Sequence, residues 1–159
     1  MNKDVLIKIG EAVCVILLAV FIIFISSTDD ISDKTVKQVV KPVVKVYDTE
    51  GLISIGKKQL KKQLKLDADS FDGYYYYASE SVMDVREVLI IKLKDMADAD
   101  AVLSVLESRV SEKTTLFDGY APEASALLKS HVLVSESGFI YYAVGEDASE
   151  GLEAFKSSL

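Results

Sequence analysis

The residues that could carry covalent chemistry are few and isolated in this sequence. Ser54 and Lys57 have the S-x-x-K spacing of acyl-enzyme nucleophiles, but the accompanying S-D-N and K-T-G motifs are missing. His131, the only histidine, has no nucleophilic cysteine and no G-x-S-x-G motif for which it could act as a base. Cys14, the only cysteine, lies in an apolar run. We therefore predict no catalytic residue and no enzymatic activity.

An acidic turn is the nearest approach to a metal site. Asp67, Asp69 and Asp72 precede Gly73, and this order resembles part of a calcium-binding loop. In an EF-hand the third acid would come one position earlier, and a glutamate would stand where this chain has Ala78. We expect a solvated turn between a helix and a strand, with no bound metal or cofactor.

The densest group of basic residues could contact an anionic partner. It consists of Lys57, Lys58, Lys61 and Lys62, with Lys65 close by. Such a cluster can bind anionic lipid headgroups or an anionic wall polymer, or it can be the solvated face of a helix. Nucleic acid is not expected as a partner, because the pI is near 4.7 and no aromatic residues are interleaved with the lysines.

Tyrosines are concentrated in the predicted strands. Four successive tyrosines, at residues 74–77, place two side chains on each face of a sheet, because side chains alternate along a strand. We select Tyr75 and Tyr77, together with Tyr141 of the last predicted strand, as candidates for an interaction surface. A helix predicted within residues 33–47 would cover this face, unless the face binds a partner.

Charge is distributed unevenly along the 159 residues, whose formal net charge is −7. Residues 31–65 contain nine lysines against three acidic residues, a net charge of +6. Residues 66–159 carry a net charge of −11. The chain therefore combines a basic part, which follows the N-terminal segment, with an acidic distal part, and the average charge describes neither.

The N-terminal segment is the most hydrophobic part of the chain and raises its mean hydropathy to +0.23. Residues 12–25 form an unbroken apolar run, and residues 9–27 are long enough for a membrane-spanning helix. We predict a short tail over residues 1–8, an uncleaved single-pass anchor over residues 9–27 and a linker over residues 28–32. The alternative is a cleaved signal peptide, but no A-x-A cleavage site follows the run.

The remainder, residues 33–159, is predicted to form a single α+β domain. Apolar residues at helical spacing predict helices over residues 33–41, 55–66, 99–117 and 122–130 and a closing helix that contains Phe155. Alternating or continuous apolar runs predict strands over residues 73–78, 87–94, 131–135 and 139–145. Ser54, Asp98 and Asp147 are the predicted helix caps.

The predicted order of these elements suggests an α+β fold in which two β-hairpins form a four-stranded antiparallel sheet. Each hairpin is followed by a helix, so the chain contains a ββα pseudo-repeat. We expect the helices mainly on one face of the sheet, and the N-terminal transmembrane helix in front of the domain.

The C-terminal part carries the pattern of a known family. The sequence PEASALLKSHVLVSESGFIYYAVGEDASEGLEAF runs from Pro122 to Phe155, and LKKQLKLDADSFDGYYYYAS precedes it. Over residues 33–159 the chain resembles the domain-of-unknown-function family numbered 4358. The resemblance implies a small exported protein of a Gram-positive bacterium, usually a lipoprotein, and it implies no activity, ligand or catalytic residue. This chain lacks a lipobox, and the predicted anchor takes its place.

The predicted anchor and the resemblance together indicate a single-pass protein of the cell membrane with an extracytoplasmic C-terminal domain. We predict a non-enzymatic binding or adaptor module of the cell envelope, whose partners are the membrane and either an envelope protein or an anionic polymer. Two alternatives remain. One is a small envelope enzyme or enzyme subunit with an unrecognised site. The other is a domain that faces the cytoplasm, which the lysines that follow the anchor would favour.

Overall fold

A computed structural model of the chain describes residues 31–159. The predicted tail and anchor, residues 1–27, and most of the predicted linker lie outside the described residues. Over the described range, none of the helices combines the length and the hydropathy that a membrane crossing requires. Ile31–Leu159 form one unit, which we describe by itself.

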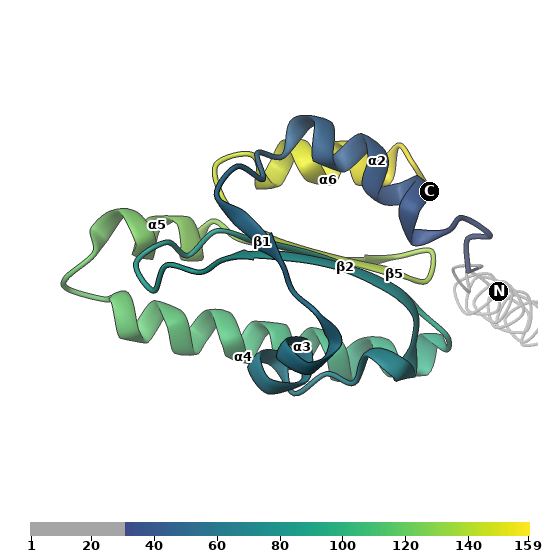
Figure 1. The fold of residues 1–159 in the computed structure, drawn as a ribbon, viewed down its shortest axis with the longest axis horizontal. Coiled ribbons are helices and arrows are strands. Elements are labelled where there is room, and N and C mark those ends of the chain that lie inside the picture. The colour runs from purple at the N-terminus through teal and green to yellow at the C-terminus, as the bar shows by residue number, and fades with distance from the viewer. Residues whose placement is uncertain (1–30) are drawn as a thin grey trace, which may run out of the picture. The chain divides into compact units, whose positions relative to one another are not determined.

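A five-stranded antiparallel sheet organises this unit (Figure 1). Its strands, in spatial order, are β1 (Leu52–Ser54), β2 (Phe71–Ser79), β3 (Glu87–Leu93), β5 (Phe139–Val144) and β4 (Val132–Glu136). The four predicted strands are present, as two hairpins. The prediction of four strands is nevertheless wrong, because β1 pairs with the end of β2 and extends the sheet. A strand of three residues is too short for an alternating pattern to reveal it.

Helices cover both faces of the sheet, because its central strand is apolar on both sides. Val88 and Ile90 of β3 point to one face, Leu89 and Ile91 point to the other, and all four are fully buried. The expectation of helices mainly on one face is therefore wrong. A continuous apolar run of this kind is typical of a strand that is buried on both faces, and it indicates a second helical layer.

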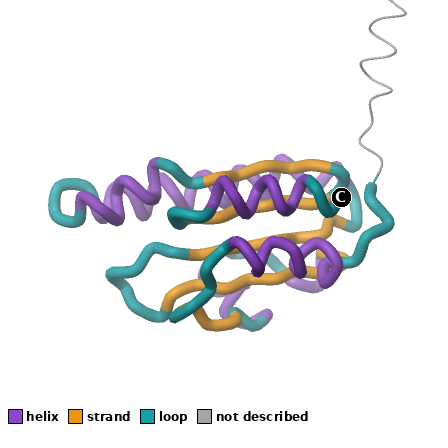
Figure 2. Tube along the Cα trace, turned by 90° about the horizontal axis from the view of Figure 1, so that it is seen from above, coloured by secondary structure: helices purple, strands orange, loops and turns teal. Residues whose placement is uncertain are grey.

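The helices are divided between the two layers. In chain order they are α2 (Val36–Val46), α3 (Lys57–Leu64), α4 (Ala99–Phe117), α5 (Pro122–Lys129) and α6 (Ala148–Lys156). Two short 3₁₀ helices, η1 (Ala68–Ser70) and η2 (Met96–Asp98), precede β2 and α4. Helices α2 and α6 lie side by side on one face, and α3 and α4 lie on the other (Figures 1 and 2). The two helices that follow the hairpins, α4 and α6, thus lie on opposite faces.

Helix α2 continues through Pro42, near which the sequence predicts that it ends. Val39 and Val43, one turn apart, are fully buried, and so is most of Tyr47 directly after the helix. Proline removes one backbone donor, and its ring crowds the preceding turn. The burial of Val43 and Tyr47 against the sheet outweighs this local preference.

The predicted helix caps differ from those in the structure. Helix α3 starts after Gly56 and not after Ser54, and the Gln59 side chain accepts a hydrogen bond from the Gly56 N–H at 3.2 Å. Asp98 and Asp147 precede α4 and α6, but neither makes a side-chain capping bond. Cap residue types therefore mark the starts of these two helices without supplying the expected bond.

Candidate functional site

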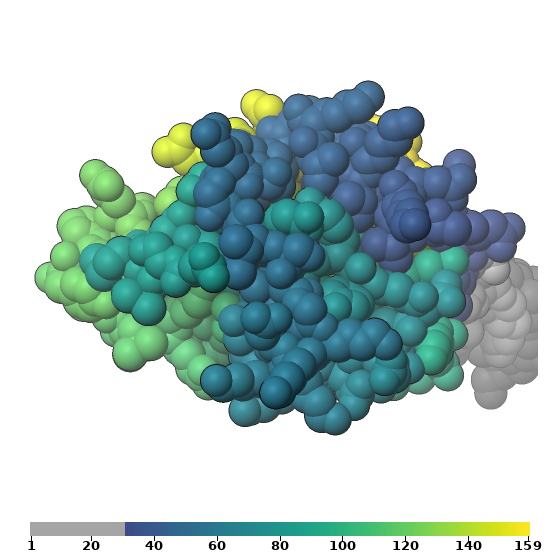
Figure 3. Space-filling model, viewed as in Figure 1, coloured from purple at the N-terminus to yellow at the C-terminus, as the bar shows by residue number. Residues whose placement is uncertain are grey.

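A basic surface is the first candidate for a functional site. Residues 31–65 form α2, β1 and α3, so they pass from one face of the sheet, around its β1 edge, to the other face. Figure 3 shows this segment, in purple to dark teal, across the viewed face of the molecule. All nine lysines of the segment are exposed. We call the exposed side of residues 31–65 the lysine surface.

Two of the four predicted lysines of α3 are held by acidic residues. Lys57 Nζ lies 2.5 Å from Asp69 Oδ1, and Lys61 Nζ lies 2.7 Å from Asp67 Oδ2. These hydrogen bonds raise the pKa of both lysines, and the bond from Lys61 lowers the pKa of Asp67. The charges of Lys57 and Lys61 are therefore partly neutralised within the domain.

The other seven lysines of the lysine surface have no acidic partner within 4.0 Å in the part of the chain that the structure describes. They are Lys34, Lys37, Lys41, Lys45, Lys58, Lys62 and Lys65. Lys37, Lys41 and Lys45 follow one another at intervals of one turn and form a stripe along α2. This stripe and the exposed lysines of α3 leave several positive charges available to an external anion.

Tyr75 and Tyr77 form a stacked aromatic pair on β2. Their ring centroids are 4.6 Å apart, and the ring planes are inclined by 17°. Both residues are half-buried on the face that α2 and α6 cover. Burial, with a smaller contribution from Tyr77, raises the pKa of Tyr75 to about 12. Helix α2 packs on this face, as expected, but it leaves both tyrosines partly accessible.

Tyr141 does not belong to an accessible surface. It is 0% exposed, and its hydroxyl donates a hydrogen bond to the Ala148 carbonyl at 2.9 Å. The ring of Phe155 packs against it with a centroid distance of 5.3 Å. Helix α6 covers Tyr141, so an external partner has no access to its side chain. This corrects its selection as a surface residue.

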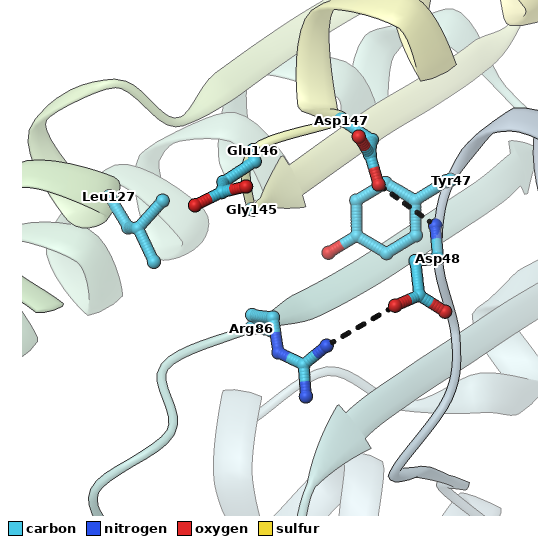
Figure 4. A pocket seen from close by; sticks show the side chains of 7 residues that line it. All are labelled: Tyr47, Asp48, Arg86, Leu127, Gly145, Glu146 and Asp147. Atoms are coloured by element: carbon cyan, nitrogen blue, oxygen red, sulfur yellow. Dashed lines mark hydrogen bonds and ion pairs between the residues drawn. The ribbon is translucent and has the colours of Figure 1, made fainter.

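A polar hollow of about 290 Å³ lies where α2 ends and α6 begins (Figure 4). There the Asp48 N–H donates to Asp147 Oδ2 at 3.2 Å, and Asp48 Oδ2 lies 3.8 Å from Arg86 Nη1. The Tyr47 hydroxyl donates to the Val144 carbonyl at 2.8 Å, and burial raises the pKa of Tyr47. These bonds join the exit of α2 to the start of α6. The polar groups that line the hollow therefore serve to connect the two helices.

The carboxylate of Glu87 is the centre of a buried polar cluster, and Glu87 is 0% exposed. Its Oε2 atom accepts hydrogen bonds from the Tyr76 hydroxyl at 2.7 Å and from Arg109 Nη2 at 2.8 Å. Its Oε1 atom accepts from the Tyr142 hydroxyl at 2.7 Å and from Lys113 Nζ at 3.1 Å. Strands β2, β3 and β5 and helix α4 thus meet at one carboxylate. We call these five residues the Glu87 cluster.

Glu87 stays ionised despite its burial. Burial by itself would raise its pKa, but hydrogen bonds from Arg109 and the charges of Arg109 and Lys113 lower the pKa to about 2. Burial lowers the pKa of Lys113, and the Glu87 charge offsets this only in part. Burial also raises the pKa values of Tyr76 and Tyr142, which therefore remain donors. The cluster therefore links the carboxylate of Glu87, on β3, to two positively charged side chains of α4.

The Glu87 cluster was not predicted, although the sequence contains a signal for it. Val102, Leu106, Arg109 and Lys113 follow one another at spacings of four, three and four residues, so both cations lie on the buried stripe of α4. Buried cations require an acidic partner. Identifying Glu87 as that partner requires knowing how α4 packs on the sheet.

The remaining motifs have structural roles. Asp67, Asp69 and Asp72 each pair with a different lysine, the last with Lys92 at 3.2 Å. The sequence F-D-G-Y occurs twice: residues 71–74 begin β2, and residues 117–120 start at the last residue of α4. His131 Nδ1 lies 2.9 Å from a backbone carbonyl of α5. These residues therefore do not assemble into one site.

Comparison with known protein families confirms the resemblance seen in the sequence. A family model described as a domain of unknown function (DUF4358) matches residues 45–145. The match runs from the end of α2 to the residue after β5, so it includes the whole sheet and all members of the Glu87 cluster. No curated protein and no solved structure matches the chain.

Proposed function

The chain belongs to the DUF4358 family, and we propose that it is a non-enzymatic binding module of the cell envelope of a Gram-positive bacterium. In this proposal the domain lies on the extracytoplasmic side and is tethered by a membrane anchor over residues 9–27. Its ligand is an anionic, phosphate-bearing polymer of the envelope, which binds to the lysine surface.

The observation that carries the proposal is the group of seven exposed lysines without an acidic partner in the described chain. An exposed ion pair between two side chains contributes little to stability. A polymer with repeated negative charges can contact several lysines at once. The electrostatic attractions at the individual lysines then sum over the length of the bound polymer. The net charge of +6 over residues 31–65 makes this side of the domain attractive to such a ligand.

The arrangement of the lysines favours a flexible polymer over a lipid bilayer. Helices α2 and α3 lie on opposite faces of the sheet, with β1 between them. A flat membrane would contact only one of the two helices, whereas a polymer can follow the edge from one to the other. The stacked rings of Tyr75 and Tyr77 offer an apolar platform for the carbon skeleton of its repeating units.

Binding of the full chain, in detergent micelles, to soluble poly(glycerol phosphate) tests the ligand. The charge reversal Lys58→Glu/Lys62→Glu is compared with Lys129→Glu/Lys156→Glu, which changes the net charge equally but lies outside the lysine surface. Since a lysine near an anionic surface contributes about 1 kcal/mol, we expect the first variant to raise the Kd about thirty-fold. Binding should also weaken as salt is added.

Three results would contradict this ligand: no binding of the unmodified chain at low salt, an equal loss of affinity in both variants, or binding to anionic vesicles without binding to the polymer. The proposed topology has its own test. Protease treatment of intact cells should degrade residues 31–159, and a protected domain would place it in the cytoplasm.

A further inference from the structure

The outer edge of β4 lacks the features that normally protect an edge strand. All five residues of β4 are partly exposed, whereas every residue of the neighbouring β5 is buried. The strand begins with Val132, Leu133 and Val134, contains no lysine or proline, and pairs with β5 without a bulge. Its one charged residue, Glu136, stands at the end next to the turn, where Lys156 Nζ lies 3.7 Å from its carboxylate. Charges, prolines and bulges are the usual devices that prevent an edge from pairing with another chain.

The opposite edge of the sheet is protected. β1 has only three residues, and directly after it the Ile55 N–H donates to the Tyr76 carbonyl at 2.8 Å. The chain then turns away from the sheet into α3. A short edge strand that leads into a helix offers little backbone to a partner. Of the two edges in the described sheet, the β4 edge is therefore the one suited to strand addition.

The hairpin turn determines which backbone groups of β4 face outward. The turn residues 137–138 have φ values of 49° and 79°, and Glu136 pairs with Phe139 across them. Two positive φ values in a two-residue loop indicate a type I′ turn, which is closed by a hydrogen-bonded pair. Because bonded and non-bonded pairs alternate, Leu133 and Ser135 direct their N–H and C=O groups away from β5.

These outward groups have no partner from any turn, loop or helix within residues 31–159. Leu133 and Ser135 thus present two donors and two acceptors in the spacing that an added antiparallel strand requires. An added strand would supply a hydrogen-bond partner to each of these backbone groups.

We propose that β4 of a second copy of this chain pairs with β4 in antiparallel orientation across a twofold axis. Leu133 of each copy then lies opposite Ser135 of the other, and the two Val134 residues face each other. The charges favour this orientation. Glu136 is the charged residue of β4, and antiparallel pairing places it opposite Val132 of the other copy, whereas parallel pairing would place two Glu136 side chains together.

The pairing would produce one continuous sheet from the two copies. The lysine surface of each copy borders its β1 edge, so both lysine surfaces would lie at the outer ends of the joined sheet. The association itself does not depend on the proposed ligand, because β4 lies at the other edge.

Cysteine cross-linking of the full chain in detergent micelles tests the pairing. Cys14→Ser removes the native cysteine, and Val134→Cys places a thiol at the proposed axis. Facing residues of a non-bonded antiparallel pair have Cα atoms about 4.5 Å apart, which a disulfide can span. Lys58→Cys, on α3 near the opposite edge, is the control. We expect Val134→Cys to form linked dimers at least about tenfold faster, because pairing raises the local thiol concentration.

Ser135→Pro, added to Val134→Cys, is the second arm of the test. Proline removes an N–H that points outward, so pairing with β5 is retained while the added strand loses a hydrogen bond. We expect cross-linking to fall to the rate of Lys58→Cys with an unchanged circular dichroism spectrum, and Ser135→Lys replaces the proline variant if that spectrum changes. Equal rates at positions 134 and 58, or a folded Ser135 variant that cross-links as fast as its parent, would overturn the proposal.

Discussion

At the scale of single residues, the side chain of Glu87 makes polar contacts with three other elements of the domain. Its carboxylate receives bonds from β2, β5 and α4, and it belongs to β3. A buried ion cluster is not by itself a source of large stability, because desolvation opposes the attraction between its charges. Its geometry does require one position of α4 along the sheet. We infer that the Glu87 cluster sets the register of α4.

Glu87→Gln should destabilise the domain strongly. The variant keeps the shape of the side chain but leaves the partly buried Arg109 and Lys113 without a negative charge beside them. Removing one partner of a buried pair lowers the free energy of unfolding by about 3–5 kcal/mol. Urea denaturation of the full chain, followed by circular dichroism, measures the change. Glu107→Gln, on the exposed side of α4, is the control and should be nearly neutral.

The pH dependence of stability gives a second readout of Glu87. Its pKa is about 2 in the folded state against an ordinary value of 4.5, so its contribution is present above about pH 4.5 and is lost as the pH falls toward 2. The unmodified chain should therefore lose stability over this interval more steeply than Glu87→Gln. Identical acid limbs for both proteins would show that Glu87 is not held ionised.

Position 151 of α6 needs a glycine because the side chain of Tyr141 lies against it, and not because of the helix backbone. A Cβ at this position would overlap the Tyr141 hydroxyl. Alanine in place of glycine inside a helix normally stabilises by about 1 kcal/mol. Here we expect Gly151→Ala to lower the denaturation midpoint instead. Adding Tyr141→Phe should recover part of the loss, because it removes the overlapping oxygen, although it also removes the bond to Ala148. Additive effects in this double-mutant cycle would contradict the explanation.

At the scale of elements, the length of α2 reflects competition between local preference and packing. Proline at position 42 favours an end to the helix, but the next turn carries side chains that the sheet buries. The helix loses one backbone hydrogen bond at Pro42, but the side chains of Val43 and Tyr47 stay buried in the core. Helix α2 therefore extends to Val46.

Two neighbouring valines test this account of α2. Val43 is 0% exposed and Val44 is 37% exposed. If the helix continues past Pro42, Val43→Ala should destabilise by about 2 kcal/mol through lost burial and a cavity, whereas Val44→Ala should change stability by less than about 0.5 kcal/mol. Thermal denaturation of both variants makes the comparison. Equal effects would indicate that the chain leaves the helix near residue 41, as the sequence predicts.

At the scale of the whole domain, charge and strand order are linked. The basic segment surrounds the β1 edge, and the unprotected β4 edge lies at the other side of the sheet. Ligand binding and self-association would therefore use different edges. A dimer joined through β4 would carry two lysine surfaces and could bind one long polymer at two places.

Polymer length should therefore matter for binding, provided that both proposals hold. We expect the unmodified chain to bind long poly(glycerol phosphate) at least about a hundred-fold more tightly than a short oligomer that reaches one lysine surface only. Ser135→Pro should lose most of this advantage and keep its affinity for the oligomer. Titration calorimetry with polymers of two lengths measures the difference. An undiminished advantage in Ser135→Pro would mean that length acts without the dimer.

Most local features of this fold could be predicted from the sequence. The apolar runs located both hairpins. The second turn was expected around residues 136–138, and the structure forms it at Ser137 and Gly138, after Glu136 has paired with Phe139. Helical spacing located α4, α5 and α6. The division of charge at residue 65 also followed from the sequence. These features depend on the period of side chains along one element, which a single sequence contains in full.

Only the tertiary structure decided which elements meet. It added β1, placed α4 and α6 on opposite faces, buried Tyr141 under α6 and brought Glu87 to Arg109 and Lys113. It also divided the α3 lysines into those held by Asp67 and Asp69 and those that have no acidic partner within residues 31–159. Each of these outcomes depends on contacts between residues that are far apart along the chain. Periodicity shows which side of an element is buried, but the partner on that side is selected by the packing of the whole domain.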